Sequence, residues 1–218
     1  MLDTKGVRFW GERDAKRIIF QLVDEHDAEM MEAEMNALRG MVSSSDWCLI
    51  TLPVGSWNED LTAWRAPAVF GKQDFGEGAE DTLTSLLAVK DELFPGQDKE
   101  FILGGYSLAG LFALWAGYQT DAFSGLVAAS PSVWYPGWLS FIEEHRMQAG
   151  RVYLSLGDKE EKARNPVMAR VGDAIRTQHE ALVKEGKDTI LTWNPGNHFK
   201  ESEIRLAKGF AWMLEGVK

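Results

Sequence analysis

The sequence predicts an α/β fold in which a mainly parallel central sheet of about six strands carries helices on both faces. Near-continuous apolar runs alternate with amphipathic helical patterns along the chain, as in sheets whose strands are joined by helical crossovers. The chain has 218 residues, with neither an internal repeat nor a linker rich in Pro, Gly or Ser. Residues 1–218 are therefore expected to form a single domain.

Six apolar runs predict the strands. Each is four to seven residues long, which is the usual length of a strand in a globular protein. Runs of this kind, bounded by helical segments, are typical of strands that are buried on both faces. In chain order the predicted strands are Arg17–Val23, Trp47–Leu52, Phe101–Gly104, Gly125–Ala129, Arg151–Leu156 and Thr189–Trp193.

Helical patterns fill the intervals between these strands. The first helix is expected from about Asp27 to Arg39, because Met31, Met35 and Leu38 fall on one face. A long loop over residues 53–78 separates the second strand from the next helix. The other predicted helices are Ala79–Leu93, Leu108–Gln119, a short one ending near Met147, Val167–Glu185 and Glu201–Leu214.

The charge balance limits the classes of partner. The net charge is −10 at pH 7, which disfavours nucleic-acid binding because phosphate neutralisation requires clustered Lys and Arg. It also disfavours docking to an anionic membrane. No run approaches 18 apolar residues, and residues 1–6 lack the apolar core of a signal peptide. We therefore expect a cytoplasmic protein that acts on a small molecule.

The sequence predicts neither a metal site nor a cofactor. Cys48 is the only cysteine, so a disulfide framework and a thiolate cluster are excluded, and its place in a predicted strand indicates a buried, inert thiol. The acidic residues and histidines show no metal-ligand spacing. Gly76-Glu-Gly78 is not followed by Lys and Ser or Thr, as a phosphate-binding loop requires.

The segment around Ser107 carries the strongest functional signal. An apolar run ending in two glycines is followed by Y-S-L and then by L-F-A-L-W at helical spacing. A buried strand that turns sharply into a helix with a serine at the bend is the pattern of a nucleophile elbow. Gly105 keeps bulk away from such a bend. The alternative interpretation is an ordinary strand-to-helix turn with an N-cap serine.

Carboxylates and a histidine follow later strands. Asp158, Glu160 and Glu161 come after the fifth predicted strand, and His198 comes after the sixth. Because the carboxyl ends of parallel strands share one edge of a sheet, we expect these side chains to lie near Ser107. A serine hydroxyl needs a neighbouring base that is oriented by a third group. The chain order of serine, acid and histidine is that of the α/β-hydrolases.

His198 is the candidate base among the four histidines. The P-G-N turn before it places it beside the sheet edge, whereas His145 and His179 fall in predicted helices with charged neighbours. His26 belongs to the turn between the first strand and the first helix. From the residues alone, any of the three carboxylates after the fifth strand could orient His198.

Three segments resemble one branch of the α/β-hydrolases. They are G-G-Y-S-L-A-G-L-F-A (residues 104–113), S-P-S-V-W (130–134) and L-G-D-K-E (156–160). That branch includes esterase D, the enterochelin and ferric-siderophore esterases, carbohydrate esterases of the feruloyl type and the antigen 85 mycolyltransferases. The resemblance covers nearly the whole chain. It implies an α/β-hydrolase fold with little or no lid and a Ser-His-acid triad, and it leaves the substrate open.

The resemblance also bears on single residues. In α/β-hydrolases the acid commonly stands three residues after a glycine that ends the strand, and three after Gly157 is Glu160, with Asp158 as the second choice. Ala109 stands where many members have glycine, which tightens the elbow. The edge hairpin of larger members is reduced to about Val7–Trp10.

An ester hydrolase also needs an oxyanion hole, in which each lost donor costs about 2.7–4 kcal/mol. One expected donor is the backbone N–H of Leu108, which follows the nucleophile. By resemblance, the second is the N–H of His26, because residues 24–27 stand where related esterases carry an Asp-Gly-x turn. Glu25 occupies the position of that glycine. The alternative is a helix N-cap at Asp24, and both interpretations are compatible.

Aromatic residues are candidates for the substrate pocket. Trp57, Trp64 and Phe75 lie in the long loop over the expected active edge, with Trp134 opposite. Long loops without regular structure in a compact domain are often functional. These side chains would wall a pocket for an acyl or aromatic-alcohol group. The competing interpretation is that the loop inserts them into the core.

The leading hypothesis is a serine carboxylic-ester hydrolase that forms an acyl-enzyme through Ser107, Glu160 and His198. An acyltransferase or thioesterase would use the same triad with another acceptor or substrate. A catalytically silent binding module is the alternative from another class, because a fold does not by itself establish a function.

Overall fold

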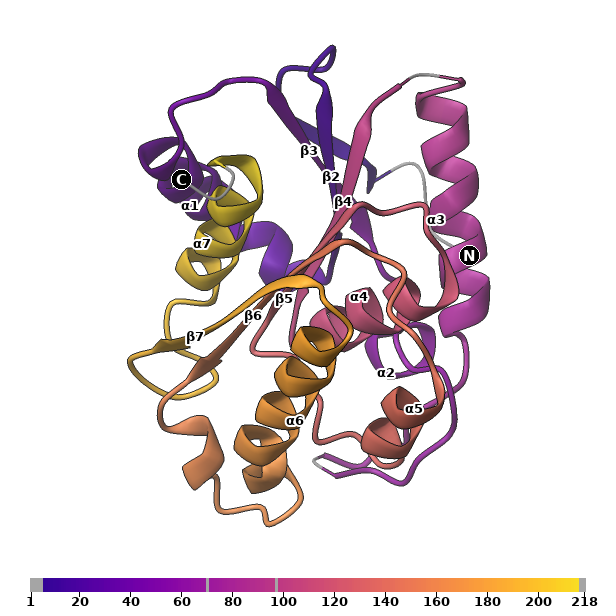
Figure 1. The fold of residues 1–218 in the computed structure, drawn as a ribbon, viewed down its shortest axis with the longest axis vertical. Helices are drawn as coiled ribbons and strands as arrows, with labels where there is room; N and C mark the ends of the chain where they lie inside the picture. The colour runs from indigo at the N-terminus through magenta and orange to yellow at the C-terminus, as the bar shows by residue number, and fades with distance from the viewer. Residues whose placement is uncertain (1–5, 70, 97, 216–218) are drawn as a thin grey trace.

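The computed structural model describes residues 6–69, 71–96 and 98–215. A seven-stranded sheet in the order β1-β3-β2-β4-β5-β6-β7 runs through the molecule (Figure 1). β1 is antiparallel to β3, and every other neighbouring pair is parallel. The strands are β1 Arg8–Gly11, β2 Arg17–Val23, β3 Trp47–Pro53, β4 Glu100–Tyr106, β5 Gly125–Ala129, β6 Arg151–Gly157 and β7 Asp188–Asn194.

This sheet confirms the predicted α/β class. Each of the six predicted strands is present with ends that shift by two residues at most, and the seventh is the short edge strand β1, where the resemblance placed a reduced hairpin. The helices are α1 Glu25–Met41, α2 Trp57–Asp60, α3 Ala79–Leu93, α4 Ser107–Gln119, α5 Trp138–Glu144, α6 Val171–Lys184 and α7 Ser202–Glu215, with 3₁₀ turns η2 Glu160–Lys162 and η3 Met168–Arg170.

The starts of α1 and α6 and the loop after β3 differ from the sequence-based expectation for local reasons, and α5 ends at Glu144 rather than near Met147. α1 begins at Glu25 because Asp24 caps it, its Oδ1 accepting a hydrogen bond from the N–H of Asp27 at 2.8 Å. α6 begins at Val171, since the residues before it form the tighter turn η3. The loop after β3 is not entirely irregular, because it contains the one-turn helix α2.

The helices cover both faces of the sheet, as Figure 1 shows. α1 and α7 pack on one face around Ile19, Met35 and Phe210, and each of these side chains is fully buried. α3, α4, α5 and α6 cover the other face, where the larger apolar cluster includes Phe20, Phe112 and their neighbours. α4 is apolar around its whole circumference and almost entirely buried, which is typical of a central helix.

The sheet topology has a switch point at β2, where the strand order reverses. β2 lies between β3 and β4, so the chain leaves β2 toward one side of the sheet and later enters β4 on the other. Ligands of open α/β sheets bind outside the carboxyl ends of the strands at such a switch point. Ser107 follows β4 directly, and α1 begins two residues after the end of β2.

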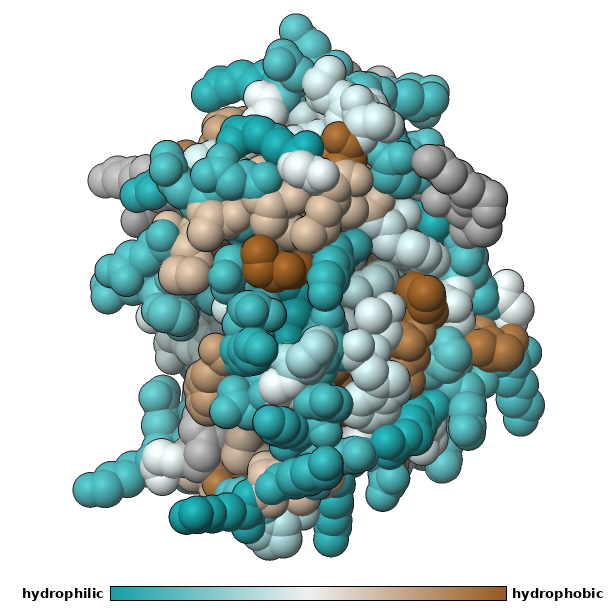
Figure 2. Space-filling view, turned by 90° about the vertical axis from the view of Figure 1, so that its left-hand side faces the viewer, coloured by the Kyte–Doolittle hydropathy of each residue, from teal (hydrophilic) through white to brown (hydrophobic). Residues whose placement is uncertain are grey.

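The outer face of α1, α7 and the β7 edge is predominantly hydrophilic. Figure 2 shows mostly teal side chains on this side, and its strongly hydrophobic groups are small and separated. Within the described ranges, no helix has the length and apolar character needed to cross a membrane.

Candidate active site

Ser107 sits at a sharp bend between β4 and α4. Its backbone φ is +57°, in the left-handed region that non-glycine residues rarely adopt. The bend brings the first turn of α4 against β4, and a Cβ on Gly105 would lie 2.4 Å from the backbone carbon of Ala109. Gly105 therefore has to be glycine. The absence of a side chain at Gly105 also leaves room for the Cβ of Ala109. Ala109 stands where many members of the branch that this sequence resembles have glycine.

Ser107, His198 and Glu160 form a continuous hydrogen-bonded chain. The Oγ of Ser107 lies 3.1 Å from Nε2 of His198, and Nδ1 of His198 lies 2.7 Å from Oε2 of Glu160. These residues come from the ends of β4, β7 and β6. The His198 side chain is 22% exposed and that of Glu160 is 5% exposed. This arrangement places a base beside the hydroxyl and an acid behind the base.

Hydrogen-bond donors surround the Glu160 carboxylate. Its Oε1 accepts hydrogen bonds from Ser130 Oγ at 2.7 Å, from Gly157 N–H at 2.7 Å and from Arg205 Nη1 at 2.8 Å. Burial opposes ionisation, but the hydrogen bond and charge of His198, with the bonds from Ser130 and Gly157, outweigh it, and the pKa of Glu160 lies below its ordinary value. The carboxylate therefore remains ionised and can stabilise an imidazolium.

The other two carboxylates of this segment are engaged elsewhere. Oδ1 of Asp158 accepts a hydrogen bond from the N–H of Gly196 at 2.7 Å. Oε2 of Glu161 pairs with Arg176 of α6 at 2.8 Å. Successive side chains of the segment thus point in different directions, and only Glu160 of the three forms a hydrogen bond with His198 among the described contacts.

Arg205 of α7 is a site residue that sequence reasoning missed. Its side chain is 1% exposed, and its Nη1 donates to Tyr106 Oη at 3.0 Å as well as to Ser130 and Glu160. Its Nη2 donates to the backbone oxygen of Asn197 at 2.8 Å. Arg205 therefore ties the acid and the histidine loop to one helix. Nothing near Arg205 in the sequence indicates this role.

Tyr106 and two serines also lie around the hydrogen-bonded chain of Ser107, His198 and Glu160. The Tyr106 hydroxyl donates to the backbone oxygen of His198 at 2.6 Å, and burial, the largest cause, raises its pKa to about 12. Ser132 Oγ lies 3.3 Å from Ser107 Oγ, and its N–H donates to the Ser107 carbonyl at 3.0 Å. Ser130 and Ser132 belong to the S-P-S-V-W segment that supported the family resemblance.

The expected oxyanion donors lie in the first turns of two helices. Leu108 is the second residue of α4 and His26 the second of α1, and these helices follow the neighbouring strands β4 and β2. Backbone N–H groups in a first turn have no intrahelical acceptor. Glu25, where related esterases have glycine, is the first residue of α1. The cap at Asp24 confirms the alternative structural interpretation of residues 24–27, which is compatible with a donor role for His26.

A cavity of about 230 Å³ opens beside His198. One of its walls is Trp134, the only one of the four pocket candidates among its lining residues. The ring of Phe199, which is 88% exposed, lies at 87° to the His198 ring with centroids 5.4 Å apart. The remaining lining residues are Lys159, Glu160, Lys162, Ala163, Met168, Val171 and Asn197.

The other three aromatic candidates do not line this cavity. Phe75 is 2% exposed and packs against Trp134 and Tyr135, at ring-centroid distances of 6.0 and 5.2 Å. Trp64 donates a hydrogen bond from Nε1 to the Pro136 carbonyl at 2.7 Å. Trp57 borders an open hollow of about 570 Å³ together with Asp24, Glu25, His26, Glu29, Val54 and Gly55.

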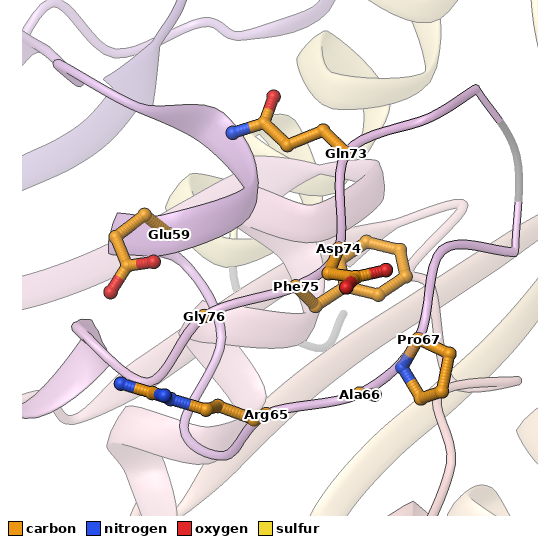
Figure 3. Close-up of a pocket in the computed structure, with 8 residues that line it drawn as sticks. All are labelled: Glu59, Arg65, Ala66, Pro67, Gln73, Asp74, Phe75 and Gly76. Atoms are coloured by element: carbon orange, nitrogen blue, oxygen red, sulfur yellow. The ribbon is translucent and has the colours of Figure 1, made fainter.

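A further open hollow of about 610 Å³ lies on the loop after β3 (Figure 3). Two segments of this loop run side by side there, joined by an antiparallel bridge between Ala66 and Phe75. The residues of the hydrogen-bonded chain are not among its lining residues, which are Glu59, Arg65, Ala66, Pro67, Gln73, Asp74, Phe75 and Gly76. Among the residues that the structure describes, no group of three or more His, Cys, Asp or Glu side chains could hold a metal ion.

The comparisons with known proteins bear on the fold. No family model and no curated protein matches the chain. An IroE-like serine hydrolase from Shewanella oneidensis matches with a TM-score of 0.73 and 16% identity, over 97% of this chain and 77% of that one. The siderophore hydrolase EstA from Aspergillus nidulans matches with a TM-score of 0.67 and 19% identity, over 93% and 84% of the two chains.

A third solved structure is longer than this chain. The enterobactin esterase FES from Shigella flexneri, in the presence of enterobactin, matches with a TM-score of 0.65 and 17% identity. The match covers 95% of this chain and 54% of that one, so this chain spans about half of the esterase. The fold is that of the α/β-hydrolases. The α/β-hydrolase fold places the loops after β4, β6 and β7 at one edge, where Ser107, Glu160 and His198 meet.

Proposed function

We propose that this protein is a serine carboxylic-ester hydrolase in which Ser107 is the nucleophile, His198 the general base and Glu160 the acid that orients His198. The observation that carries the proposal is the chain of hydrogen bonds of 3.1 and 2.7 Å that links the three side chains. The left-handed backbone of Ser107 supports it, since strained residues of this kind cluster at active sites.

Acylation begins at Ser107. Nε2 of His198 takes the hydroxyl proton while Oγ attacks the ester carbonyl carbon, and the carbonyl oxygen becomes an oxyanion. The N–H groups of Leu108 and His26 are the proposed donors to that oxyanion. When the tetrahedral intermediate collapses, the bond to the alcohol oxygen breaks, and the imidazolium of His198 returns the proton to the leaving alcohol.

Deacylation repeats the same steps with water. His198 removes a proton from a water molecule that attacks the acyl carbon, and the carboxylic acid leaves as Oγ of Ser107 is reprotonated. Glu160 remains a carboxylate throughout, consistent with the hydrogen bonds that keep its pKa low. Its negative charge holds the proton on Nδ1 of His198 and stabilises the imidazolium that forms in each half of the reaction.

The likeness to a serine hydrolase and to siderophore and enterobactin esterases supports the reaction class. At 16–19% identity this likeness shows the fold alone. From the proposed mechanism we infer that the substrate is a small-molecule ester, and the likeness does not identify which one.

The first test is covalent labelling. A fluorophosphonate probe should react with the wild-type protein at Ser107, because only an activated serine hydroxyl attacks it at a useful rate. Ser107→Ala should abolish labelling and lower kcat for a 4-nitrophenyl ester by several orders of magnitude. Circular dichroism and the melting temperature of the variant should remain close to wild type.

The matched control is Ser132→Ala, which removes the other serine hydroxyl near the nucleophile. This variant should still be labelled. Retention of more than about a tenth of the wild-type kcat by Ser107→Ala would refute the nucleophile assignment. An unlabelled wild-type protein that hydrolyses no ester would favour a binding module with an inert fold.

A further inference from the structure

The cavity beside His198 has an unusual combination of walls. Trp134, Met168, Val171 and Phe199 provide apolar surface, and the Phe199 side chain is almost entirely uncovered. At about 230 Å³ the cavity is smaller than the ~300–1,000 Å³ of pockets that hold drug-sized ligands. It therefore suits a small group with an apolar or aromatic body.

The charge that this cavity offers to a ligand is positive. Lys159 and Lys162 line it, and within the described part of the chain neither ammonium forms an ion pair with a carboxylate. Glu160 is the one carboxylate among the lining residues, and both of its oxygens are occupied, Oε1 by three donors and Oε2 by His198.

Neither of the two neighbouring acids forms an ion pair with these lysines among the described contacts. Asp158 accepts from the Gly196 N–H, and Glu161 pairs with Arg176. Neither acid lines the cavity. Two cations thus lie at an apolar cavity in a chain whose net charge is −10, so the local charge at the cavity is opposite in sign to that of the molecule. A ligand with a carboxylate would meet complementary charge there.

The position of the cavity indicates which part of an ester would enter it. In the proposed mechanism, His198 gives its proton to the leaving alcohol oxygen, which must therefore lie within hydrogen-bond reach of Nε2. The expected oxyanion donors belong to α1 and α4 instead. Since His198 and residues beside it line the cavity, and Ser107 and Leu108 do not, the alcohol part of the ester is the part expected to face the cavity.

We propose that this cavity binds the alcohol part of the substrate and that this part carries a carboxylate on a small apolar or aromatic body. The enzyme would then hydrolyse acylated hydroxy acids, with water converting the ester into a carboxylic acid and a free hydroxy acid. Trp134 and Phe199 contact the body, and Lys159 and Lys162 attract the carboxylate. This inference rests on the proposed ester hydrolysis and adds the substrate class.

The test compares two esters that differ in one charge. 4-(Butanoyloxy)benzoate carries a carboxylate on the alcohol part, and 4-(butanoyloxy)benzamide replaces it with a neutral amide. We expect wild-type kcat/KM to favour the benzoate and this preference to fall as salt screens the lysines. Lys159→Gln and Lys162→Gln should each lower the ratio of the two kcat/KM values about two- to fivefold, as expected for partly exposed ion pairs.

The matched control is Arg164→Gln. Arg164 is an exposed cation two residues after Lys162 that does not line the cavity, so the ratio should stay at its wild-type value. Lys162→Glu should reduce the ratio further than Lys162→Gln, because it replaces attraction with repulsion. An equal decrease for Arg164→Gln would indicate general charge steering and overturn the assignment to this cavity.

A binding measurement gives a readout that does not depend on turnover. Calorimetric titration of the Ser107→Ala protein with 4-hydroxybenzoate and with 4-hydroxybenzamide should show tighter binding of the anion, and Lys162→Gln should reduce the difference. A second ester pair places the charge on the acyl part, as 4-nitrophenyl hemiglutarate against 4-nitrophenyl valerate. We expect no lysine-dependent preference within that pair.

The outcomes separate this inference from the proposed function. If the wild-type protein reacts with the fluorophosphonate and hydrolyses the neutral ester, but the lysine variants leave the benzoate preference and 4-hydroxybenzoate binding unchanged, the substrate class is wrong and the hydrolase stands. A lysine-dependent preference confined to the acyl pair would likewise overturn the assignment of the alcohol part. If no ester is hydrolysed and no serine is labelled, the proposed function is wrong and the inference falls with it.

Discussion

Glu160 differs from its neighbours because of what its side chain reaches. It stands between two other acidic positions, Asp158 and Glu161, yet it is the residue of the three that is buried and lies 2.7 Å from Nδ1 of His198. A carboxylate in that position fixes the tautomer of the histidine and stabilises its protonated form. Asp158 and Glu161 cannot take over this role, because their carboxylates are engaged with other partners.

This difference predicts the effect of neutralising each acid. Glu160→Gln should lower kcat for a 4-nitrophenyl ester by at least about a hundredfold, because the amide can present a donor to His198 and favour the wrong tautomer. Asp158→Asn and Glu161→Gln are the matched controls and should change kcat much less. If Asp158→Asn proved the crippling change, the assignment of the acid would be wrong.

The backbone of Ser107 predicts a measurable strain. A non-glycine residue in the left-handed region costs roughly 1–2 kcal/mol, and Ser107→Ala keeps that cost while Ser107→Gly removes it. We expect the glycine variant to unfold at a temperature about 2–4 °C higher than the alanine variant, which corresponds to about 1 kcal/mol in a chain of this size. Differential scanning calorimetry of both inactive variants measures the difference. Equal melting temperatures would contradict a strained elbow.

At the scale of elements, the loop between β3 and α3 divides into parts with different surroundings. Phe75 is buried and packs against Trp134 and Tyr135. Trp64 is held by its hydrogen bond to Pro136 and by ring contacts with Tyr135 and Phe141. Trp57 begins α2 and borders the hollow beside the first turn of α1. The loop therefore inserts some of its aromatic side chains into the core and leaves Trp57 at a hollow that His26, one of the expected oxyanion donors, also lines.

Truncation of the aromatic side chains should separate these parts. Phe75→Ala should cost about 3–5 kcal/mol in the free energy of unfolding, as expected for a buried aromatic side chain. Trp57→Ala should cost less than Phe75→Ala and should change kcat/KM unevenly across esters of different chain length. Urea denaturation and an ester panel test both expectations. A Trp57→Ala protein with wild-type kcat/KM for every ester would show that Trp57 does not face the substrate.

At the scale of the whole molecule, a buried acid between the sheet and its helical layer links stability to pH. Glu34 of α1 is 2% exposed and accepts a hydrogen bond from Nε2 of Gln21 on β2 at 3.2 Å. Burial, the largest cause, and the charges of Asp27 and Glu203 outweigh the hydrogen bond from Gln21 and raise the pKa of Glu34 to about 8. A protonated Glu34 could donate to Oε1 of Gln21, which has no other partner among the described residues.

The sign of the resulting pH dependence follows from this shift. The folded protein keeps the Glu34 proton up to a pH of about 8, whereas the unfolded chain releases it near 4.5. The stability associated with Glu34 is therefore fully present below pH 4.5 and is lost as the pH rises toward 8. Glu160 has the opposite sign, because its lowered pKa adds stability that is lost only as the pH falls below its ordinary range.

We expect Glu34→Gln to stabilise the protein relative to wild type by an amount that grows from pH 5 to pH 8. The amide stays neutral at every pH and can pair with the Gln21 amide. Urea denaturation of both proteins at several pH values within this window measures the difference. A difference in the free energy of unfolding that stays constant with pH would show that Glu34 is ionised in the folded protein throughout the window.

The fold class and the chain order of the candidate residues could be predicted from local patterns in the sequence. Near-continuous apolar runs separated by helical patterns permit few arrangements besides a covered parallel sheet, and a parallel sheet gathers the ends of its strands at one edge. Ser107 and His198 could therefore be predicted as neighbours from their places after strands. The sharp turn at Gly105 and Ser107 could also be predicted, because few residues other than glycine fit such a bend.

Features that depend on the direction of side chains and on contacts between distant segments became visible only in the folded structure. The choice among the three carboxylates after β6 is one example, because each points a different way from the same short segment. Arg205 is another, since a helix pattern shows that a residue faces the core but not that it meets an acid 45 positions earlier in the chain. The cavity with its two lysines is a third. The position of each strand along the chain follows from local sequence patterns, whereas such contacts form only when separate elements pack together.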